Sequence, residues 1–567
     1  MTSPRTYLNP VHPHSFPDPF VLKHRGEYWG YCTGLWHDGR AFGVIRSRDL
    51  VDWQPLAGAL EALSGNHPCY WAPEVSCFEG RFYLYYSVGN EERMEIRIAV
   101  ADHPAGPFVD SGRKLTHEPF AIDAHVFADV DGSRWLFYAT DFLDRSHVGT
   151  GTVRDRLLDP FTLEGNPRPV ALPRHDWHVY HPNRPEKGGV RWHTVEGPFV
   201  LRRKGVLYEM FSGGNWQNPT YGVSFAKARS LTGSAEWEQA GLPILRSGGE
   251  VVGPGHNSAV RGPDNRQLWC VYHRWSAGLK DRVLAIDPLD WAGERMLVLG
   301  PTTEPQPAPN LPTISDLLDA PAVLAPGEEI RYEIGTPSFL AEVSVRGDFS
   351  VALRGRQEDL LRVQGRGDFF RLLRLEVDGL RVSASFEDEE PLELKRLAEP
   401  LSALVLAAGE ASAEFSAFSL TAGWEDLFEE EGDPAALGWE GAGWRVEQGR
   451  LWGEGDSWIS KGPTPADFLA VINARLESPG GEYLFALGDR QLALKNFPIP
   501  AGFDPGIDQQ FRLRKMGKTA EISWEGIPLG TVEAPPGPLR LGLGTAGARV
   551  SFEMDRVTAT SPSGSLS

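Results

Sequence analysis

Short runs of alternating aromatic or aliphatic and polar residues recur through the first half of the chain. Each run follows a turn built around Gly26, Gly80, Gly132, Gly205 or Asn265, and successive turns are 52 to 73 residues apart. Alternation of this kind predicts β-strands, and the Gly and Asn turns predict hairpins. A hairpin that returns every 50 to 70 residues is typical of a repeat architecture.

A polar residue stands six to nine residues ahead of each turn, in otherwise apolar surroundings. A single such residue is usually a turn cap or an ion-pair partner. An unpaired charge is costly to bury, so five polar residues in register suggest that the strands direct them to one place. We therefore expect a five-bladed β-propeller in which each blade lends its inner strand to a central channel. The five residues expected to face the axis at one end are Asp18, Glu74, Asp123, Glu196 and His256.

The pattern changes after a Pro-rich linker at residues 300–310. Short alternating strands fill residues 316–422 and again 423–562, each stretch having the size of a β-sandwich. The predicted fold class is therefore all-β: a five-bladed propeller followed by two β-sandwich domains. The predicted boundaries are 1–305 for the propeller, 306–422 and 423–562 for the sandwiches, and 563–567 for a disordered tail. The second sandwich faintly resembles laminin-G or concanavalin-like modules.

Composition narrows the class of partner. A net charge of −20 argues against nucleic acid or an anionic membrane. The 18 Trp residues suit either a propeller core or a sugar-binding surface. The N-terminus lacks the apolar stretch of a signal peptide, which predicts a cytoplasmic protein, and no apolar run approaches the length of a membrane span. The four Cys residues show no metal-ligand spacing and are expected to be reduced.

Carboxyl groups that converge in a water-poor cavity have pKa values pushed apart, which separates an acid from a base. Two carboxyl groups about 6.5–9.5 Å apart, with room for water between them, cleave glycosides with inversion. Aromatic faces beside such a pair favour a sugar substrate. Trp36 and Trp71 are the candidates for substrate contact, whereas most other Trp residues are expected to pack in the propeller core.

The motifs together resemble those of glycoside hydrolase family 43. The segments that carry the resemblance are Pro17-Asp18-Pro19, Trp71-Ala72-Pro73-Glu74, Ile122-Asp123-Ala124, Val195-Glu196-Gly197-Pro198, Gly255-His256-Asn257-Ser258 and Asp287-Pro288-Leu289-Asp290-Trp291. The resemblance covers about residues 7–305. It implies an inverting hydrolase with Asp18 as general base, Glu196 as general acid, and Asp123 raising the pKa of the acid and orienting it.

The same resemblance suggests further site residues. Arg282 would reach the bound sugar, or else form a surface ion pair. Glu74 would bind a sugar hydroxyl or organise the floor of the pocket. His256 would be a ligand or neighbour of a structural calcium ion on the axis, or else a buried histidine bonded to a carboxylate. One imidazole is an unusual ligand for so hard a cation.

The leading function is an exo-acting or debranching hydrolase of arabinose- or xylose-containing oligosaccharides, an α-L-arabinofuranosidase or a β-D-xylosidase. An endo-arabinanase is the first alternative, and a non-catalytic carbohydrate-binding propeller is the alternative from another class. A protein-interaction propeller would not need the axial carboxylates. The long insertion between the third and fourth hairpins, with His175 to Trp192, is expected to wall one side of the pocket. The first sandwich is expected to narrow the pocket by closing over it.

Overall fold

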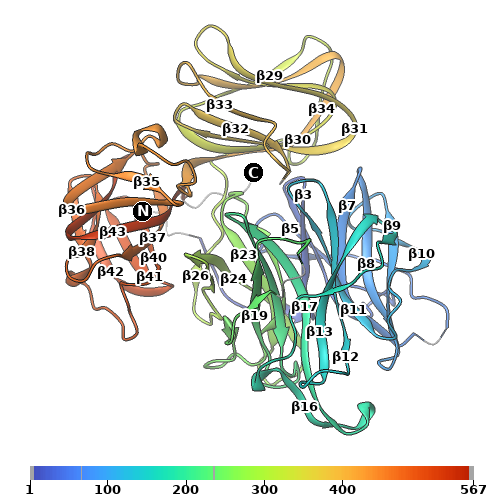
Figure 1. The fold of residues 1–567 in the computed structure, drawn as a ribbon. Helices are drawn as coiled ribbons and strands as arrows, with labels where there is room; N and C mark the ends of the chain where they lie inside the picture. Colours follow the sequence, from blue (N-terminus) through green and yellow to red (C-terminus); the bar gives the residue numbers. More distant parts are fainter. Residues whose placement is uncertain (1–4, 66, 234–236, 388, 561–567) are drawn as a thin grey trace.

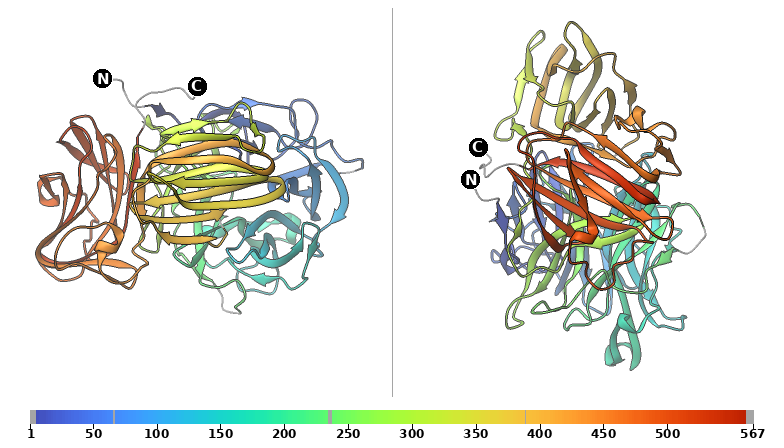
Figure 2. Two further views of the ribbon diagram at one scale, coloured as in Figure 1. Left: turned by 90° about the horizontal axis from the view of Figure 1, so that it is seen from above. Right: turned by 90° about the vertical axis from the view of Figure 1, so that its left-hand side faces the viewer.

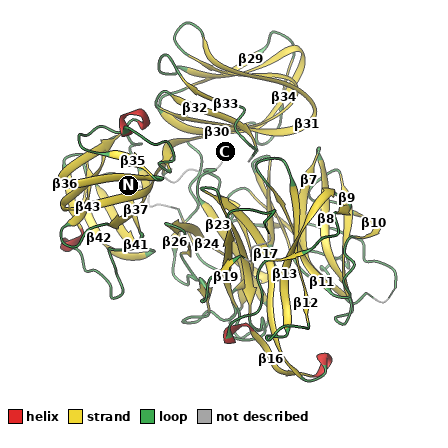
Figure 3. Cartoon of the chain, viewed as in Figure 1, coloured by secondary structure: helices red, strands yellow, loops and turns green. Residues whose placement is uncertain are grey.

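The computed structural model describes residues 5–65, 67–233, 237–387 and 389–560 (Figure 1). Nearly all regular structure in these residues is β-strand (Figure 3). The helical segments among them are single 3₁₀ turns: η1 (Asp176–His178), η2 (Pro185–Lys187), η3 (Pro434–Leu437) and η4 (Leu494–Asn496). No helix in the described part of the chain has the length and apolarity needed to cross a bilayer. The chain is all-β, with an N-terminal propeller region and further β-sheet domains.

The first two blades are separate four-stranded antiparallel sheets in chain order. The first contains β3 (Phe20–His24), β4 (Glu27–Tyr31), β5 (Val44–Ser47) and β6 (Gln54–Pro55). The second contains β7 (Cys69–Phe78), β8 (Arg81–Gly89), β9 (Met94–Ala101) and β10 (Val109–Lys114). Burial nearly alternates along β9, whereas β4 and β8 are buried over most of their length, as expected for strands covered on both faces.

The next two blades are joined by a short parallel pairing of β13 with β17. The third contains β11 (Ala121–Ala128), β12 (Arg134–Phe142), β13 (Gly149–Asp159), β14 (Thr162–Leu163) and β15 (Arg168–Pro169). The fourth contains β17 (Val190–Arg203), β18 (Val206–Gly213), β19 (Gly222–Ala228), β20 (Glu238–Gln239) and β21 (Leu245–Arg246). The insertion supplies β16 (Val179–Arg184), which pairs with β17.

The last blade is completed by the start of the chain. It contains β22 (Gly255–Arg261), β23 (Leu268–Trp275), β24 (Arg282–Ala292) and β25 (Arg295–Val298), and β2 (His12–Ser15) pairs with β24. A further pair joins β1 (Thr6–Tyr7) to β26 (Gln306–Pro307). Strands from both ends of the propeller region therefore hold its ring closed.

Each inner strand carries one residue in the left-handed backbone region near its start. These residues are Asp18, Ala72, Asp123, Gly197 and His256, with φ between 42° and 60°. Each lies eight or nine residues before the turn residue of its blade. The strand pairing shifts at this point in the four later blades, as at a β-bulge. The kink is thus the feature that repeats from blade to blade.

This register corrects the predicted ring of five polar residues. The kinked residue coincides with the predicted one at Asp18, Asp123 and His256. Glu74 instead lies two residues beyond the kink at Ala72, and Glu196 lies one residue before the kink at Gly197. Glu74 still lines the axial cavity with Asp18, Asp123 and His256, whereas the fourth blade contributes Gly197 to the lining in place of Glu196.

The region after the propeller forms one hydrogen-bonded path of strands around two separate hydrophobic cores. The first core lies among β27 (Ile314–Asp316), β28 (Ala322–Leu324), β29 (Glu329–Glu333), β30 (Ser338–Arg354), β31 (Asp359–Asp378), β32 (Arg381–Phe386), β33 (Glu393–Arg396) and β34 (Ala403–Asp426). The proposed boundary between residues 422 and 423 falls inside β34, which pairs with β30 up to Ala422 and with the last strand from Gly423.

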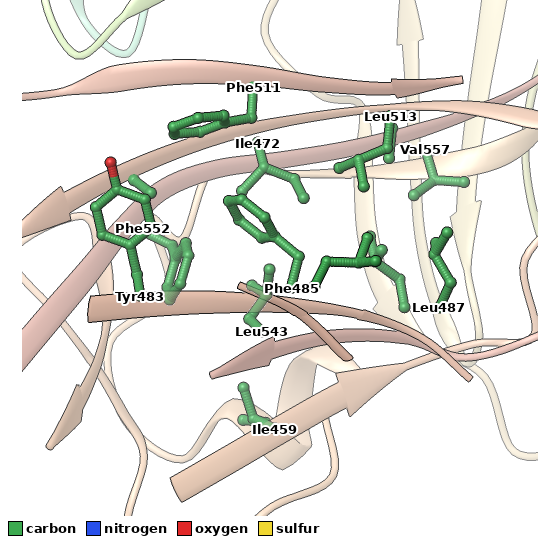
Figure 4. Close-up of a cluster of buried hydrophobic side chains, with 14 of the residues drawn as sticks. Ile459, Ile472, Tyr483, Phe485, Leu487, Phe511, Leu513, Leu543, Phe552 and Val557 are labelled. Atoms are coloured by element: carbon green, nitrogen blue, oxygen red, sulfur yellow. The ribbon is translucent and has the colours of Figure 1, made fainter. Parts of the chain in front are cut away.

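The second core packs aromatic and aliphatic side chains from facing strands, including Ile472, Phe485, Phe511 and Phe552 (Figure 4). Its strands are β35 (Arg445–Glu447), β36 (Arg450–Lys461), β37 (Phe468–Leu476), β38 (Glu482–Leu487), β39 (Arg490–Ala493), β40 (Gln509–Met516), β41 (Thr519–Trp524), β42 (Ile527–Glu533) and β43 (Leu541–Ala559). The predicted disordered tail, 563–567, lies outside the described residues.

In the accessory region, residues 314–559, the strands β27–β34 lie across one end of the propeller, and β35–β43 lie beside it, next to β24 (Figures 1 and 2). The accessory region touches the first turn in every blade. The contacts are Gly26 with Leu318 and Ala417, Gly80 with Phe369, Val130 with Glu390, Lys204 with Gly449 and Glu553, and Asn265 with Ser419. These turns are at the opposite end of the inner strands from Asp18, Asp123 and Glu196. The expectation that the first sandwich closes over the pocket was therefore wrong, because it packs on the other end of the propeller.

Candidate active site

A small cavity lies on the propeller axis, below the starts of the inner strands. Its volume is about 30 Å³, enough for a water molecule or an ion. All five blades line it, through residues 18–20, 72–74, 123–124, 197–199 and 256–258. The side chains of Asp18, Glu74 and Asp123 are all less than a tenth exposed, so the cavity brings together three buried acids from three blades.

Asp18 is held in its ionised form. The Arg282 guanidinium donates to Asp18 Oδ1 at 2.6 Å. The Nδ1 atoms of His273 and His256 lie 3.3 and 3.5 Å from the same oxygen. Burial raises the pKa of Asp18, but the positive charge of Arg282 is the main effect that lowers it, and the pKa lies well below its usual value. His273 Nδ1 accepts the backbone N–H of Asp18 at 3.1 Å, so this ring is neutral at that nitrogen.

Glu196 has the opposite tendency. Burial is the main cause that raises its pKa to about 7, and the negative charge of Asp18 adds to it. The hydroxyl of Tyr221 donates to Glu196 Oε1 at 2.8 Å and lowers the pKa, as do the nearby charges of Arg282 and Arg184. A carboxyl group with a pKa near 7 can hold a proton at neutral pH and release it during a reaction.

Asp123 is close to both Asp18 and Glu196 and is connected to Glu196 through the backbone. Its Oδ2 accepts the N–H of Gly197, the residue next to Glu196, at 3.0 Å. Its own N–H donates to Ser87 Oγ at 2.9 Å. Burial, then Glu196 and Asp18, raises the pKa of Asp123 well above its usual value, which favours the neutral form. These contacts support an orienting effect on Glu196 more directly than the predicted effect of a negative charge.

Glu74 is occupied within the propeller. Its Oε2 lies 2.9 Å from His125 Nδ1, and its Oε1 accepts the N–H of Val126 at 2.8 Å. The side chain is buried and lines the axial cavity. This arrangement favours the alternative in which Glu74 organises the floor of the pocket over the one in which it binds a sugar hydroxyl.

The aromatic candidates differ in their surroundings. Trp36 is half-buried, donates its indole N–H to Leu56 O at 2.8 Å, and packs on the backbone of Gly43. Trp71 is half-buried at the junction of the second and third blades and packs on a cluster that includes Ile122, the neighbour of Asp123. Substrate contact by either ring stays a prediction.

The guanidinium of Arg282 connects Asp18 to a pair of stacked tryptophan rings. Its guanidinium lies over the ring of Trp216, 4.4 Å from the centroid, while it binds Asp18. Trp216 in turn stacks on Trp275, with ring centroids 6.0 Å apart and planes 11° from parallel. This ion pair is with the proposed base and is 14% exposed at Arg282, so the alternative of a surface ion pair is not what the structure contains.

The ligands that an axial calcium ion would need can be compared with the side chains around the cavity. Calcium takes six to eight oxygen ligands. No group of three or more His, Cys, Asp or Glu side chains in the described residues is arranged to hold a metal ion. His256 faces Asp18 and Gly197, and burial lowers its pKa, so it is a neutral imidazole. The side chains alone do not fit a calcium site, and the ion stays a prediction on which no step below depends.

Two residues of the insertion lie close to Glu196. Asn215 holds β16 by donating to Tyr180 O at 2.9 Å. The charge of Glu196 raises the pKa of Tyr180, and the charge of Arg184 lowers the pKa of Glu196. Arg184 also lies over the Tyr180 ring, 4.9 Å from its centroid. These contacts support the expectation that the insertion stands at one side of the pocket.

Sequence reasoning missed Tyr221 and His273, and placed Trp216 in the core. Each belongs to a segment that was expected only to pack in the propeller core, and none belongs to a motif that repeats between blades. The one related feature in the sequence is Gly255, against which the Tyr221 ring packs. A Cβ on Gly255 would lie 2.2 Å from that ring, so the position requires a glycine.

The comparisons with known proteins place the chain in a family. The description "Glycosyl hydrolases family 43" applies to the family model that matches residues 7–296. A β-D-galactofuranosidase of Aspergillus niger is 30% identical over 287 residues, which are 47% of this chain and 76% of that protein. An extracellular exo-α-(1→5)-L-arabinofuranosidase of Streptomyces avermitilis is 26% identical over 288 residues, 47% of this chain and 56% of that protein.

Among solved structures, a thermostable family-43 glycoside hydrolase is 32% identical, with a TM-score of 0.48, and the match covers 54% of this chain and 99% of that one. The family model spans half of the chain, and its matched segment holds every acid of the axial cavity. The chain belongs to glycoside hydrolase family 43, an inverting family.

Proposed function

We propose that this protein is an exo-acting or debranching hydrolase of arabinose- or xylose-containing oligosaccharides, an α-L-arabinofuranosidase or a β-D-xylosidase. The observation that carries the proposal is the pair of opposite pKa shifts at one site: Arg282 keeps Asp18 ionised, while burial keeps a proton on Glu196. Two acids with separated pKa values are what glycoside cleavage by inversion requires.

In the proposed mechanism, Glu196 donates its proton to the glycosidic oxygen as the bond from that oxygen to the anomeric carbon breaks. Asp18 takes a proton from a water molecule, which attacks the anomeric carbon from the opposite face. The products are an inverted sugar and a free hydroxyl on the leaving sugar, with the proton now on Asp18. Release of this proton to solvent and reprotonation of Glu196 restore the enzyme.

The insertion supports the choice of exo-acting or debranching cleavage. Tyr180 and Arg184 of the insertion lie near Glu196, which supports a pocket bounded on that side by β16. The alternative is an endo-arabinanase, which would need an open cleft across this face. Size analysis of early products distinguishes the two, since an exo-acting enzyme releases single sugars from linear arabinan and an endo-acting enzyme releases mixed oligomers.

The architecture has a finer description that we propose with the function: five blades followed by two β-sandwiches, with boundaries at residues 305, 422 and 562. The sheets given above support five blades, and the two separate hydrophobic cores support two sandwiches.

The test is release of 4-nitrophenol from aryl α-L-arabinofuranoside, β-D-xyloside and β-D-galactofuranoside by the wild type, Asp18→Ala and Glu196→Ala. The galactofuranoside is included because the relative from Aspergillus niger carries that name. Loss of either group should lower kcat/KM by about 10³-fold or more, equal to about 4 kcal/mol of transition-state stabilisation. Full activity in either variant would remove that residue from its proposed role.

A further inference from the structure

Tyr221 stands directly before the third strand of the fourth blade, and the second strand lies between it and the inner strand that carries Glu196. It is 1% exposed, and its hydroxyl donates to Glu196 Oε1 at 2.8 Å. The hydrogen bond is therefore made in a water-poor place, where a bond to a charged oxygen is strong.

The ring of Tyr221 is fixed on both sides. One face stacks on His273, with ring centroids 5.8 Å apart and planes 9° from parallel. On another side it packs so tightly on Gly255 that a Cβ there would lie 2.2 Å from a ring carbon. A side chain confined in this way places its hydroxyl with little freedom.

The same stack reaches the base. His273 Nδ1 accepts the backbone N–H of Asp18 at 3.1 Å, so one face of the His273 ring supports Tyr221 while its edge holds Asp18. The acid and the base are thus joined through two packed rings. Neither ring needs to touch the sugar for this connection to set the relative positions of the two carboxyl groups.

We propose that Tyr221 is a positioning residue for the general acid: held between His273 and Gly255, it fixes the orientation of Glu196 and limits how firmly that residue retains its proton. This proposal rests on the proposed function of Glu196. Other groups that face Glu196 come from several elements and remain in place when the hydroxyl is removed: Asp18, Asp123, Tyr180, Arg184, His256 and Arg282.

The sign of the effect follows from the donor. The Tyr221 hydroxyl stabilises ionised Glu196, so its removal raises the pKa of the acid above about 7. The acid must be protonated to act, so the alkaline limb of kcat/KM moves to higher pH in Tyr221→Phe. A hydrogen bond to a charged group corresponds to a shift of about one to two pH units.

The experiment measures the pH profile of kcat/KM for the wild type, Tyr221→Phe and Tyr28→Phe. Tyr28 is a matched control, because it is a buried tyrosine whose hydroxyl donates to Arg261 O at 3.0 Å, away from the acids. A second variant replaces Tyr221 by 3-fluorotyrosine, which keeps the ring and the hydroxyl but makes the hydroxyl a stronger donor. Its alkaline limb should move to lower pH, opposite to that of Tyr221→Phe.

A second readout compares leaving groups. A misplaced acid harms cleavage most when the leaving group needs protonation, so Tyr221→Phe should lose about tenfold more rate with an oligosaccharide than with a 4-nitrophenyl glycoside. An alkaline limb that stays in place in both Tyr221 variants, with equal losses on both substrates, would overturn the proposal. If Glu196→Ala kept full activity, the proposed function would fail instead, so the two failures are distinguishable.

Discussion

Buried carboxyl groups at the two ends of the propeller differ in how many cations they are paired with. At the cavity end, three acids from different blades share few cations, and the pKa values of Asp123 and Glu196 rise while only that of Asp18 falls. At the turn end, two buried acids, Glu553 and Asp290, are each paired with two cations. Glu553 of the accessory region binds Arg203 and Lys204 at 2.8 and 2.9 Å, and its pKa falls to about 2.

Asp290 shows the same complete pairing at the turn end, with Arg556 at 2.6 Å and Arg512 at 3.1 Å. The comparison teaches what incomplete pairing achieves. A carboxylate with two cations stays ionised and stabilises an interface, whereas one that lacks its own cation stays ready to exchange a proton. The same residue types therefore support stability at one end and chemistry at the other.

The largest expected effect on stability is at the turn end. Glu553→Ala leaves Arg203 and Lys204 buried without their carboxylate, which should cost about 3–5 kcal/mol of unfolding free energy. The rate constant kcat should stay near that of the wild type, because the cavity end is untouched. Calorimetry and initial rates measure the two effects.

The matched control is Glu440→Ala, which breaks an ion pair with Arg540 at an acid that is 75% exposed and should change little. The pH dependence gives a further check. The pKa of Glu553 is lower in the folded state than in the unfolded state, so its contribution is present above pH 4.5 and is lost as the pH falls towards 2. A large loss of kcat in Glu553→Ala would contradict the separation of the two ends.

At the cavity end, Arg282→Ala should lower kcat/KM at neutral pH by about a hundredfold, because the base loses the cation that keeps it ionised and oriented. The pKa of Asp18 should rise by about 1–3 units, and since the base acts when ionised, the acidic limb of the pH profile should move to higher pH. Arg282→Lys keeps the charge and should restore part of the shift. An unmoved acidic limb in Arg282→Ala would show that another group sets the ionisation of Asp18.

The smallest expected effect is on stability and concerns Glu209, which lies in β18 between the two ends of the propeller. Glu209 is fully buried, and burial raises its pKa to about 8, although Thr152 and Arg154 act to lower it. The folded state therefore holds a proton that the unfolded state releases, so stability falls as the pH rises from 4.5 through 8.

Glu209→Gln should remove this slope and add about 1–2 kcal/mol to the unfolding free energy at pH 8. Glu238→Gln, at an acid 76% exposed in the same blade, is the control. Denaturant titrations at pH 5 and pH 8 measure the difference, and equal slopes in the wild type and Glu209→Gln would mean that Glu209 is already paired.

The repeat was predictable because the sequence of each blade contains the same kind of turn and the same alternation of apolar and polar residues. The acids Asp18, Asp123 and Glu196 were found for that reason, since each stands at a fixed distance from its turn. The second blade shows the limit of counting: Glu74 was chosen for its charge, although the kink that sets the register is at Ala72. The shorter interval from Glu74 to its turn was the available sign.

Contacts between distant segments could not be read in this way. Tyr221 meets Glu196 inside the fourth blade, across an intervening strand. His273 meets Asp18 across 255 positions because the last blade packs beside the first. The position of the accessory region depended equally on three-dimensional packing. Its strands were predictable from alternation, but nothing in that pattern states which end of the propeller Phe369, Ser419 and Glu553 would contact.

The most direct test of the central claim is a crystal structure with arabinose or xylose bound. The account predicts that the anomeric carbon lies between Asp18 and Glu196, with the two carboxyl groups about 6.5–9.5 Å apart and room for one water molecule on the Asp18 side. A sugar bound at the turn end, or carboxyl groups only about 5 Å apart, would contradict it.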